Sequence, residues 1–246
     1  MNRDHVMTTL PLLLVPGLMC DHAVWELSLP SLSSQRACTV VDHGSADSLA
    51  QMARQMLDSA PPHMLLAGHS MGARVVLEAL RQAPERIRGV ALLDTGFLPK
   101  SSGVDGEEES RKRFALLTVA REQGLAVMAR EWVKGMVHPA RLQDDDLIER
   151  IISMFERKTA DIFECQIRSL LGRPDGSDVL HSITVPTLLM CGRQDTWSPV
   201  TQHQAMQALA PAAVLDVIED AGHMAPMEQP KAVAQSIERW MARCER

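Results

Sequence analysis

A serine set between two glycines is the feature with the clearest chemistry. The motif GHSMG at residues 68–72 follows the apolar run 64–67 and precedes the helical spacing of residues 74–80. In a tight strand-to-helix turn of the form G-x-S-x-G, the serine is lifted clear of the backbone and its hydroxyl is exposed. We expect glycine to be required at Gly68 and Gly72 because a side chain there would collide across the turn. The motif therefore predicts Ser70 as a nucleophile.

A serine hydroxyl is a weak nucleophile until a base takes its proton, and histidine is the usual base. Of the nine histidines, His223 follows the apolar run 214–218. Its loop is predicted to leave the carboxyl end of a strand, where catalytic groups gather in open α/β sheets. His69 adjoins the serine but is expected to point elsewhere on a sharp turn. We predict His223 as the base.

An acid should orient the imidazole and stabilise its charged form. Asp195 ends the sequence CGRQD directly after the apolar run 187–190, and it lies between Ser70 and His223 in chain order. That order, serine then acid then histidine, is the one found with a G-x-S-x-G turn. Asp94 follows the preceding apolar run and remains the alternative acid.

Two backbone amides are candidates for stabilising an oxyanion. The Met71 amide follows the serine at the positive end of the predicted helix. The second amide should come from the loop after the first apolar run, where Gly17 allows the chain to turn so that the Leu18 amide faces the serine. Leu18 and Met71 are the predicted oxyanion hole.

Apolar side chains next to these catalytic positions predict the character of a substrate pocket. Met19, Trp197 and Met224 flank the oxyanion loop, the acid and the base in the sequence. Pockets for small molecules are lined mainly by apolar side chains. We predict that these three residues line an apolar pocket, although burial in the core is an equally reasonable reading for methionine and tryptophan.

Short apolar runs alternate with helical spacing, and this pattern predicts the elements that position the site. The apolar runs are residues 10–15, 39–41, 63–67, 90–93, 187–190 and 214–218. The helical segments between and after them are residues 48–59, 71–82, 199–209 and 230–244. Buried runs of this kind are typical of parallel strands. The expected fold is α/β, a mostly parallel, doubly wound sheet of about six core strands.

The alternation stops after residue 93, which predicts an insertion. Residues 98–182 carry four helical patterns and no convincing strand. Apolar residues in two of these patterns fall on one helical face. We predict a core formed by residues 1–97 and 183–246, and a helical cap insertion formed by residues 98–182.

Charge and hydropathy limit the possible partners. The formal net charge is −6, and residues of both signs are scattered without a basic stripe. No nucleic acid partner is therefore expected. The apolar run near the start, residues 10–15, is far shorter than the roughly 18 residues that a membrane span needs. Neither secretion nor a membrane partner is expected.

Cysteine and histidine spacing predicts a reduced compartment and no cofactor. The five cysteines are odd in number, widely spaced and contain no C-x-x-C pair, so a cytoplasmic location is expected. The histidines and carboxylates lack the spacing of a zinc or calcium site. Residues 68–72 do not form the dinucleotide motif G-x-G-x-x-G. We predict no metal and no cofactor.

Four motifs together resemble the α/β-hydrolase family, in its branch of small carboxylesterases and enol-lactonases. They are PGL at 16–18, GHSMG at 68–72, GRQD at 192–195, and GH at 222–223 followed by EQP at 228–230. The resemblance covers nearly all of the chain outside the insertion, and it implies the same roles for the catalytic and oxyanion residues named above. One departure is Pro16, where a histidine is common. This change leaves the Leu18 amide available but removes a side chain that often braces the loop.

The resemblance implies hydrolysis of a carboxylic ester or lactone of a small, fairly apolar substrate through an acyl-serine intermediate. The same fold also supports carbon–carbon bond hydrolysis and other non-ester reactions, and it includes small-molecule receptors that turn over slowly. A scaffolding role is disfavoured because all three triad residue types stand at matching positions. The expected partner is a small molecule, and the expected state is a monomer or a small homo-oligomer.

Overall fold

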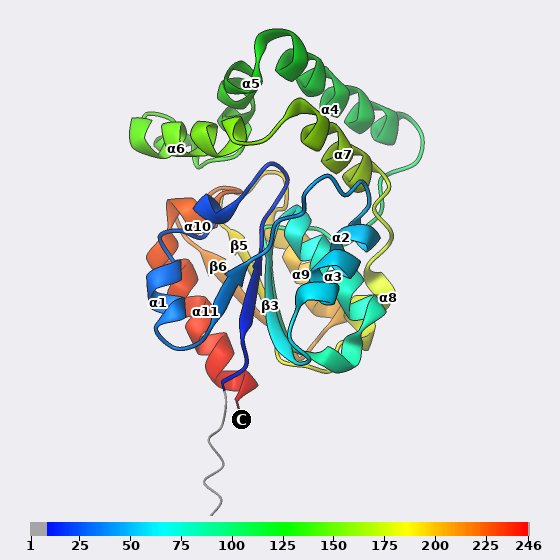
Figure 1. The fold of residues 1–246 in the computed structure, drawn as a ribbon, viewed down its shortest axis with the longest axis vertical. Helices are drawn as coiled ribbons and strands as arrows, with labels where there is room; N and C mark the ends of the chain where they lie inside the picture. Colours follow the sequence, from blue (N-terminus) through cyan, green and yellow to red (C-terminus); the bar gives the residue numbers. More distant parts are fainter. Residues whose placement is uncertain (1–8, 246) are drawn as a thin grey trace, which may run out of the picture.

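Six parallel strands form one sheet at the centre of the computed structural model, which describes residues 9–245 (Figure 1). In chain order the strands are β1 Leu12–Val15, β2 Cys38–Val40, β3 Met64–His69, β4 Ile87–Leu93, β5 Thr187–Gly192 and β6 Val214–Ile218. Their spatial order is β2-β1-β3-β4-β5-β6, and every neighbouring pair is parallel. The predicted α/β class with about six core strands is confirmed.

The strands are apolar because the sheet is covered on both faces. Strands β1, β3 and β5 are buried along their whole length. Helices α1 (Leu29–Ser33) and α11 (Pro230–Cys244) pack together on one face. On the other face lie α2 Leu49–Ser59, α3 Met71–Gln82, α8 Ser177–Ser182 and α9 Val200–Leu209 (Figure 1). The sheet is therefore doubly wound, as the alternation predicts.

The strand order reverses beside β1, and this reversal determines where the site can form. From β1 the chain moves outward to β2, then returns to add β3 on the other side of β1. In open α/β sheets, ligands bind outside the carboxyl ends of the strands near such a reversal. Ser70 follows β3, Asp94 follows β4, and the Asp195 and His223 loops follow β5 and β6. The predicted catalytic positions thus leave the same edge of the sheet.

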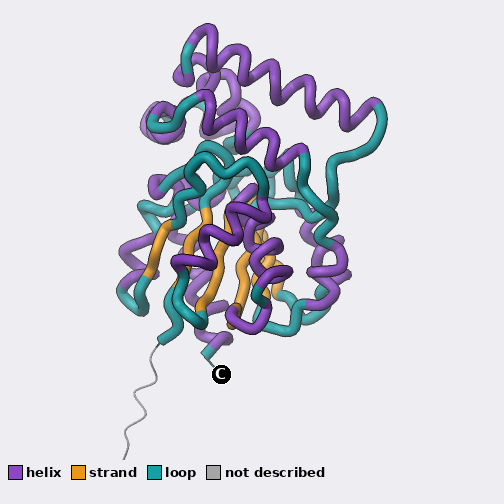
Figure 2. The backbone as a smooth tube through the Cα atoms, turned by 45° about the vertical axis from the view of Figure 1, so that its right-hand side comes forward, coloured by secondary structure: helices purple, strands orange, loops and turns teal. Residues whose placement is uncertain are grey.

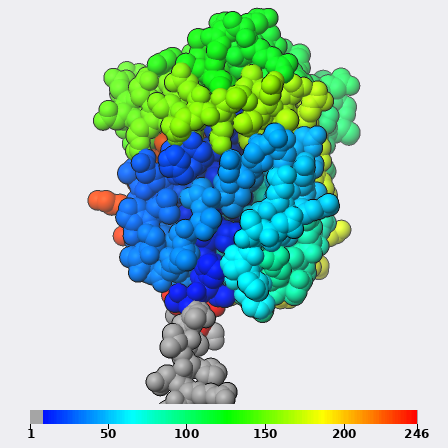
Figure 3. Space-filling view, in the orientation of Figure 1, coloured from blue at the N-terminus to red at the C-terminus, as the bar shows by residue number. Residues whose placement is uncertain are grey.

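Four helices between β4 and β5 lie over that edge. They are α4 Val104–Gln123, α5 Leu125–Trp132, α6 Asp145–Glu156 and α7 Ala160–Leu171. Figures 2 and 3 show them as a layer above the sheet and its flanking helices. Helix α8 differs from our expectation: it falls within residues 98–182 but packs against α3 and α9. The limits of the core and the insertion stay a prediction.

A search of residues 9–245 finds no helix long and apolar enough to cross a membrane. The five cysteines are all free thiols, and Cys20 and Cys191 are buried. Burial raises the pKa of both thiols to about 12, so they are protonated at neutral pH.

Candidate active site

Ser70 occupies a strained turn between β3 and α3. Its backbone φ is 54° and its ψ is −117°, a conformation that a residue with a side chain rarely adopts. A β-carbon added to Gly68 would lie 2.5 Å from the Ala73 backbone, and one added to Gly72 would lie 2.1 Å from the Val15 carbonyl oxygen. The expected need for both glycines is confirmed. The turn brings the serine hydroxyl out of the helix axis and toward the loops that follow β5 and β6.

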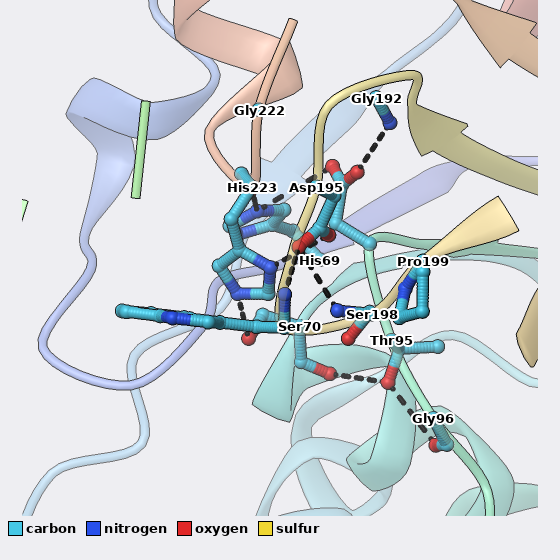
Figure 4. Close-up of polar contacts among 12 residues, drawn as sticks. His69, Ser70, Thr95, Gly96, Gly192, Asp195, Ser198, Pro199, Gly222 and His223 are labelled. Atoms are coloured by element: carbon cyan, nitrogen blue, oxygen red, sulfur yellow. Dashed lines mark hydrogen bonds and ion pairs between the residues drawn. The ribbon is translucent and has the colours of Figure 1, made fainter. Parts of the chain in front are cut away.

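His223 meets this hydroxyl from the loop after β6 (Figure 4). Its Nε2 lies 2.8 Å from Ser70 Oγ. The ring is buried, and its backbone amide donates to the Met136 carbonyl oxygen at 2.7 Å. His223 is therefore held both by its backbone amide and by the hydrogen bond of its ring.

Asp195 completes a hydrogen-bonded chain. Its Oδ2 lies 2.8 Å from His223 Nδ1, while its Oδ1 accepts the amides of Trp197 at 2.8 Å and Ser198 at 2.9 Å. Burial alone would raise the pKa of this carboxyl, but the charge and hydrogen bond of His223 and the two amides together lower it. Asp195 therefore remains ionised at neutral pH and can hold His223 Nδ1 as a donor.

Asp94, the alternative acid, has a different environment. It is fully buried, its Oδ1 accepts the Gly192 amide at 2.8 Å, and its Oδ2 has no hydrogen-bond partner among residues 9–245. Burial, and then the charge of Asp195, raises the pKa of Asp94 well above its usual range. The structure thus brings Asp195 to His223 and leaves Asp94 beside β5.

We expect Asp94→Asn to gain stability over the wild type as pH rises. A carboxyl whose pKa is raised by folding stabilises the native state fully below its unfolded pKa, and this contribution is lost as pH rises through the folded pKa. Between about pH 4 and about pH 7, the free energy of unfolding should therefore fall in the wild type relative to the variant, by on the order of 1 kcal/mol. Asparagine also tolerates the positive φ of this position, 47°.

Urea denaturation of both proteins at several pH values measures the difference. A gap between the two stabilities that stays constant with pH would contradict the raised pKa of Asp94.

His69 does not reach the serine, as expected, but it has a role that the sequence analysis missed. Its Nε2 donates to the His223 carbonyl oxygen at 2.8 Å. Burial, and then the neighbouring His223, lowers the pKa of His69 to about 3, so the ring stays neutral. The fully enclosed ring thus supports the backbone of His223. Position next to the serine was the only signal for this contact.

The oxyanion loop approaches the serine closely. A β-carbon added to Gly17 would lie 3.1 Å from Ser70 Cβ, so glycine is what permits this distance. Leu18 and Met71 both line the cavity that contains Ser70. Since α3 begins at Met71, its amide has no carbonyl acceptor in a preceding helical turn. Both residues thus lie on the wall of the cavity that contains the hydroxyl.

Buried side chains replace the brace that Pro16 lacks. The His43 Nε2 donates to the Pro16 carbonyl oxygen at 2.9 Å. From α7, the Gln166 Oε1 accepts the Met19 amide at 2.7 Å, next to the Leu18 amide. Asp21 accepts two hydrogen bonds from Arg157, at 2.7 and 2.9 Å. The loop is therefore held by the sheet layer on one side and by the cap on the other.

The cap also holds the histidine loop. Glu228 Oε1 accepts the Gly222 amide at 2.8 Å, and its Oε2 accepts the His138 amide at 2.7 Å. Burial raises the pKa of Glu228, although these amides oppose the shift. The Met136 carbonyl also accepts the His223 amide. These contacts join residues 136–138 to the loop that contains Gly222 and His223.

A cavity of about 380 Å³ lies over the serine. Trp197 and Met224 line it, as predicted, but Met19 lies in the core with a fully buried side chain. The Met19 side chain packs among the apolar residues of the core, while its backbone, with a positive φ of 61°, donates its amide to Gln166. Met19 is therefore corrected from a pocket residue to a core residue.

A second cavity, of about 400 Å³, adjoins the first under the cap. Most of its wall is apolar and consists of Leu116, Trp132, Phe163, Ile167 and Trp197; the charged residues Glu109, Lys112 and Arg113 complete the lining. The two tryptophans also line the first cavity, and their rings are stacked with centroids 5.8 Å apart. The stacked pair forms the common wall of a polar chamber that contains Ser70 and an apolar chamber in the cap.

The arrangement can perform nucleophilic catalysis. A neutral His223 Nε2 can accept the Ser70 proton, and Asp195 stabilises the imidazolium that results. Within residues 9–245, no group of three or more histidine, cysteine, aspartate or glutamate side chains is placed to hold a metal ion.

Known proteins resemble this chain along nearly its whole length. A model of the Alpha/beta hydrolase family matches residues 12–236. The pimeloyl-(acyl-carrier protein) methyl ester esterase of Photobacterium profundum is 27% identical over 238 residues, which cover 92% of each chain.

Solved structures are similar to the same extent. A thermophilic esterase from Thermogutta terrifontis, solved with malate bound, has a TM-score of 0.84 and 26% identity, covering 97% of this chain and 92% of that one. The enol-lactonase from Burkholderia xenovorans has a TM-score of 0.82 at 16% identity, covering 95% and 92%, and this likeness shows the fold alone.

Proposed function

Because the chain belongs to the alpha/beta hydrolase family, we propose that it hydrolyses a carboxylic ester or lactone of a small, fairly apolar substrate with Ser70 as nucleophile. Esterases are among the relatives that match it over most of their length. The observation that carries the proposal is the hydrogen-bonded chain from Asp195 through His223 to Ser70, which ends in a cavity.

In the proposed reaction, Ser70 Oγ attacks the carbonyl carbon while His223 Nε2 takes the hydroxyl proton. The carbonyl oxygen becomes an oxyanion that accepts hydrogen bonds from the Leu18 and Met71 amides. His223 then gives the proton to the departing alcohol oxygen, which leaves an acyl ester on Ser70. Water then attacks the acyl carbon while His223 Nε2 takes a water proton. The bond between this carbon and Ser70 Oγ breaks, His223 gives the proton to Oγ, and the carboxylic acid leaves.

The apolar chamber is the proposed site for the apolar part of the substrate. It opens beside Trp197, whose ring centroid lies 4.9 Å from that of His223. Burial of a hydrocarbon chain there contributes about 0.8 kcal/mol per methylene group. Among neutral esters, longer acyl chains should therefore be hydrolysed with higher kcat/KM until the chamber is full.

We expect Gln166→Leu to lower kcat by about 10-fold with little change in KM, because an oxyanion donor acts mainly in the transition state. Leucine removes the acceptor that holds the Met19 amide and so loosens the adjacent Leu18 amide. Gln166→Glu is the matched variant, because a carboxylate oxygen replaces the amide oxygen as the acceptor. It is expected to retain more of the wild-type kcat than the leucine variant. Equal kcat in the leucine variant and the wild type would exclude this role for Gln166.

Two measurements on the wild type test the proposed function. A fluorophosphonate probe should add one label, found by peptide mass spectrometry on Ser70, and p-nitrophenyl esters of increasing acyl length should be turned over in the steady state. Labelling without turnover would favour a carbon–carbon hydrolase or a slow receptor on the same fold. No labelling would refute the active nucleophile.

Two further predictions concern the setting of the protein. The free thiols of the five cysteines fit the reduced, cytoplasmic compartment that their spacing predicts. A monomer or small homo-oligomer, acting on a small molecule without nucleic acid or membrane, stays the predicted state.

A further inference from the structure

The wall of the Ser70 cavity carries more positive than negative charge. Three arginines, Arg74, Arg113 and Arg173, line it together with one glutamate on the cap, Glu109. Asp94 also lies at this cavity, but it is fully buried beside β5 and its raised pKa disfavours its charge. Charged groups are rarely placed in a closed wall without a partner. The ion pairs therefore show which of the three guanidinium groups has no carboxylate partner.

Glu109 is shared by two of the arginines. It accepts hydrogen bonds from Arg173 Nη1 and Nη2 at 2.7 and 2.8 Å, a bidentate contact. It also pairs with Arg113, whose Nη2 lies 2.9 Å away. One carboxylate thus faces two guanidinium groups, and it is already fully engaged.

Arg74 has no carboxylate partner among the described residues. Its Nη1 donates to the Leu98 carbonyl oxygen at 3.0 Å, and Arg173 Nε donates to the same oxygen at 3.3 Å. Burial, and then the charge of Arg173, lowers the pKa of Arg74. The lowered pKa of Arg74, about 9, still leaves the guanidinium protonated at neutral pH. Two like charges therefore converge on one neutral oxygen.

The Gln202 amide packs against the backbone of Gly96, beside the Arg74 guanidinium. A β-carbon added to Gly96 would lie 3.0 Å from Arg74 Nη2 and 2.0 Å from Gln202 Nε2. Both Gly96 and Gln202 line the cavity. Because glycine has no side chain, the Gln202 amide fits at this place, and its Nε2 and Arg74 Nη2 lie at most 5.0 Å apart. Two neighbouring donors at the wall of one cavity suit an acceptor with negative charge.

Arg74 also lies close to the reacting centre. It follows Ser70 by four residues and stands in the first turn of α3. Four residues of α-helix correspond to about 6 Å along the axis, so a short saturated chain can join a group at Arg74 to a carbonyl at Ser70.

On the basis of the proposed function, we propose that Arg74, with Gln202, binds a carboxylate of the substrate, so that the preferred ester carries a second, free carboxylate on its acyl part. A planar carboxylate can accept two parallel hydrogen bonds from a guanidinium, and it would give Arg74 the carboxylate partner that Glu109 gives to Arg113 and Arg173. The substrate class is therefore the monoester, or the corresponding lactone acid, of a dicarboxylic acid.

The test compares esters that differ only in this charge. Monomethyl esters of succinic, glutaric, adipic and pimelic acid are assayed against methyl esters of unbranched monocarboxylic acids of matching length. For the best chain length, the ratio of kcat/KM for the acid ester to that for the neutral ester should fall by about 10- to 100-fold in Arg74→Gln, the effect of losing a hydrogen bond to a charged group. Glutamine keeps a donor for the Leu98 carbonyl.

Arg111→Gln is the matched control. Arg111 is an exposed arginine on α4 that pairs with Glu108, so the same charge is removed from the same protein outside the cavity. The ratio should be unchanged in this variant. Thermal unfolding of both variants confirms that they are folded.

The outcomes separate this inference from the proposed function. Ester hydrolysis that depends on Ser70 but shows no preference for the acid ester, or a preference unaffected by Arg74→Gln, would overturn the carboxylate site and leave the esterase intact. If no ester is hydrolysed, calorimetric titration with glutarate and adipate decides. Binding that Arg74→Gln weakens at least 10-fold supports the site, and equal or absent binding in both proteins overturns it.

Discussion

Ser70→Ala is expected to lower kcat for p-nitrophenyl esters by about 10⁶-fold and to abolish fluorophosphonate labelling. The variant loses the only atom that can form the acyl intermediate, while the Leu18 and Met71 amides remain. A residual rate above that of water is therefore expected from binding and oxyanion stabilisation. Steady-state assays and intact-mass spectrometry measure the two effects.

A serine far from the site provides the matched control. Ser59 ends α2, and its hydroxyl donates to carbonyl oxygens of the same helix. Ser59→Ala should react with the fluorophosphonate probe and hydrolyse p-nitrophenyl esters as the wild type does. Activity that survives in Ser70→Ala would require another nucleophile and would end the proposed mechanism.

Asp195→Asn is expected to lower kcat by about 10⁴-fold. The asparagine oxygen can still accept the Trp197 and Ser198 amides, so the loop should keep its geometry. Its amide nitrogen would then donate to His223 Nδ1. This contact forces the proton onto Nε2, which can no longer accept the proton of Ser70. The loss should appear in kcat at every pH where the wild type is active.

Asp94→Asn is the matched comparison, because it makes the same change in the alternative acid. The His223 ring is hydrogen-bonded to Asp195 and Ser70 and not to Asp94, so the Asp94 variant should keep kcat within about 10-fold of the wild type. The reverse result, with Asp94→Asn inactive and Asp195→Asn active, would assign the acid to Asp94.

The parts of the site that depend on local sequence could be predicted. Ser70, Asp195 and His223 each follow a strand whose apolar run is visible in the sequence, and parallel strands bring such positions to one edge. The close packing around Gly68 and Gly72 follows from the steric demands of one turn. These expectations needed no knowledge of which distant segments touch.

The contacts of the cap could not be predicted in this way. Gln166 reaches the Met19 amide across 147 positions, and nothing in its own helix distinguishes it from a surface glutamine. For Met19 the sequence left pocket and core equally open, and only the folded chain, in which its side chain packs in the core, decides between them. The unpaired state of Arg74 also depends on where Glu109 and Arg173 meet, which only the folded chain determines.

The cap makes hydrogen bonds with two loops, at Met19 and at His223. These contacts restrict which segments could be exchanged between this protein and its relatives. A chimera that exchanges the whole segment between β4 and β5 would lose the Gln166 acceptor and the Met136 carbonyl together. New specificity from such an exchange would come with a displaced histidine and a loosened oxyanion loop. Changes confined to the tryptophan wall or to Gly96 leave both anchors in place, so point variation is the more accessible route to new substrates.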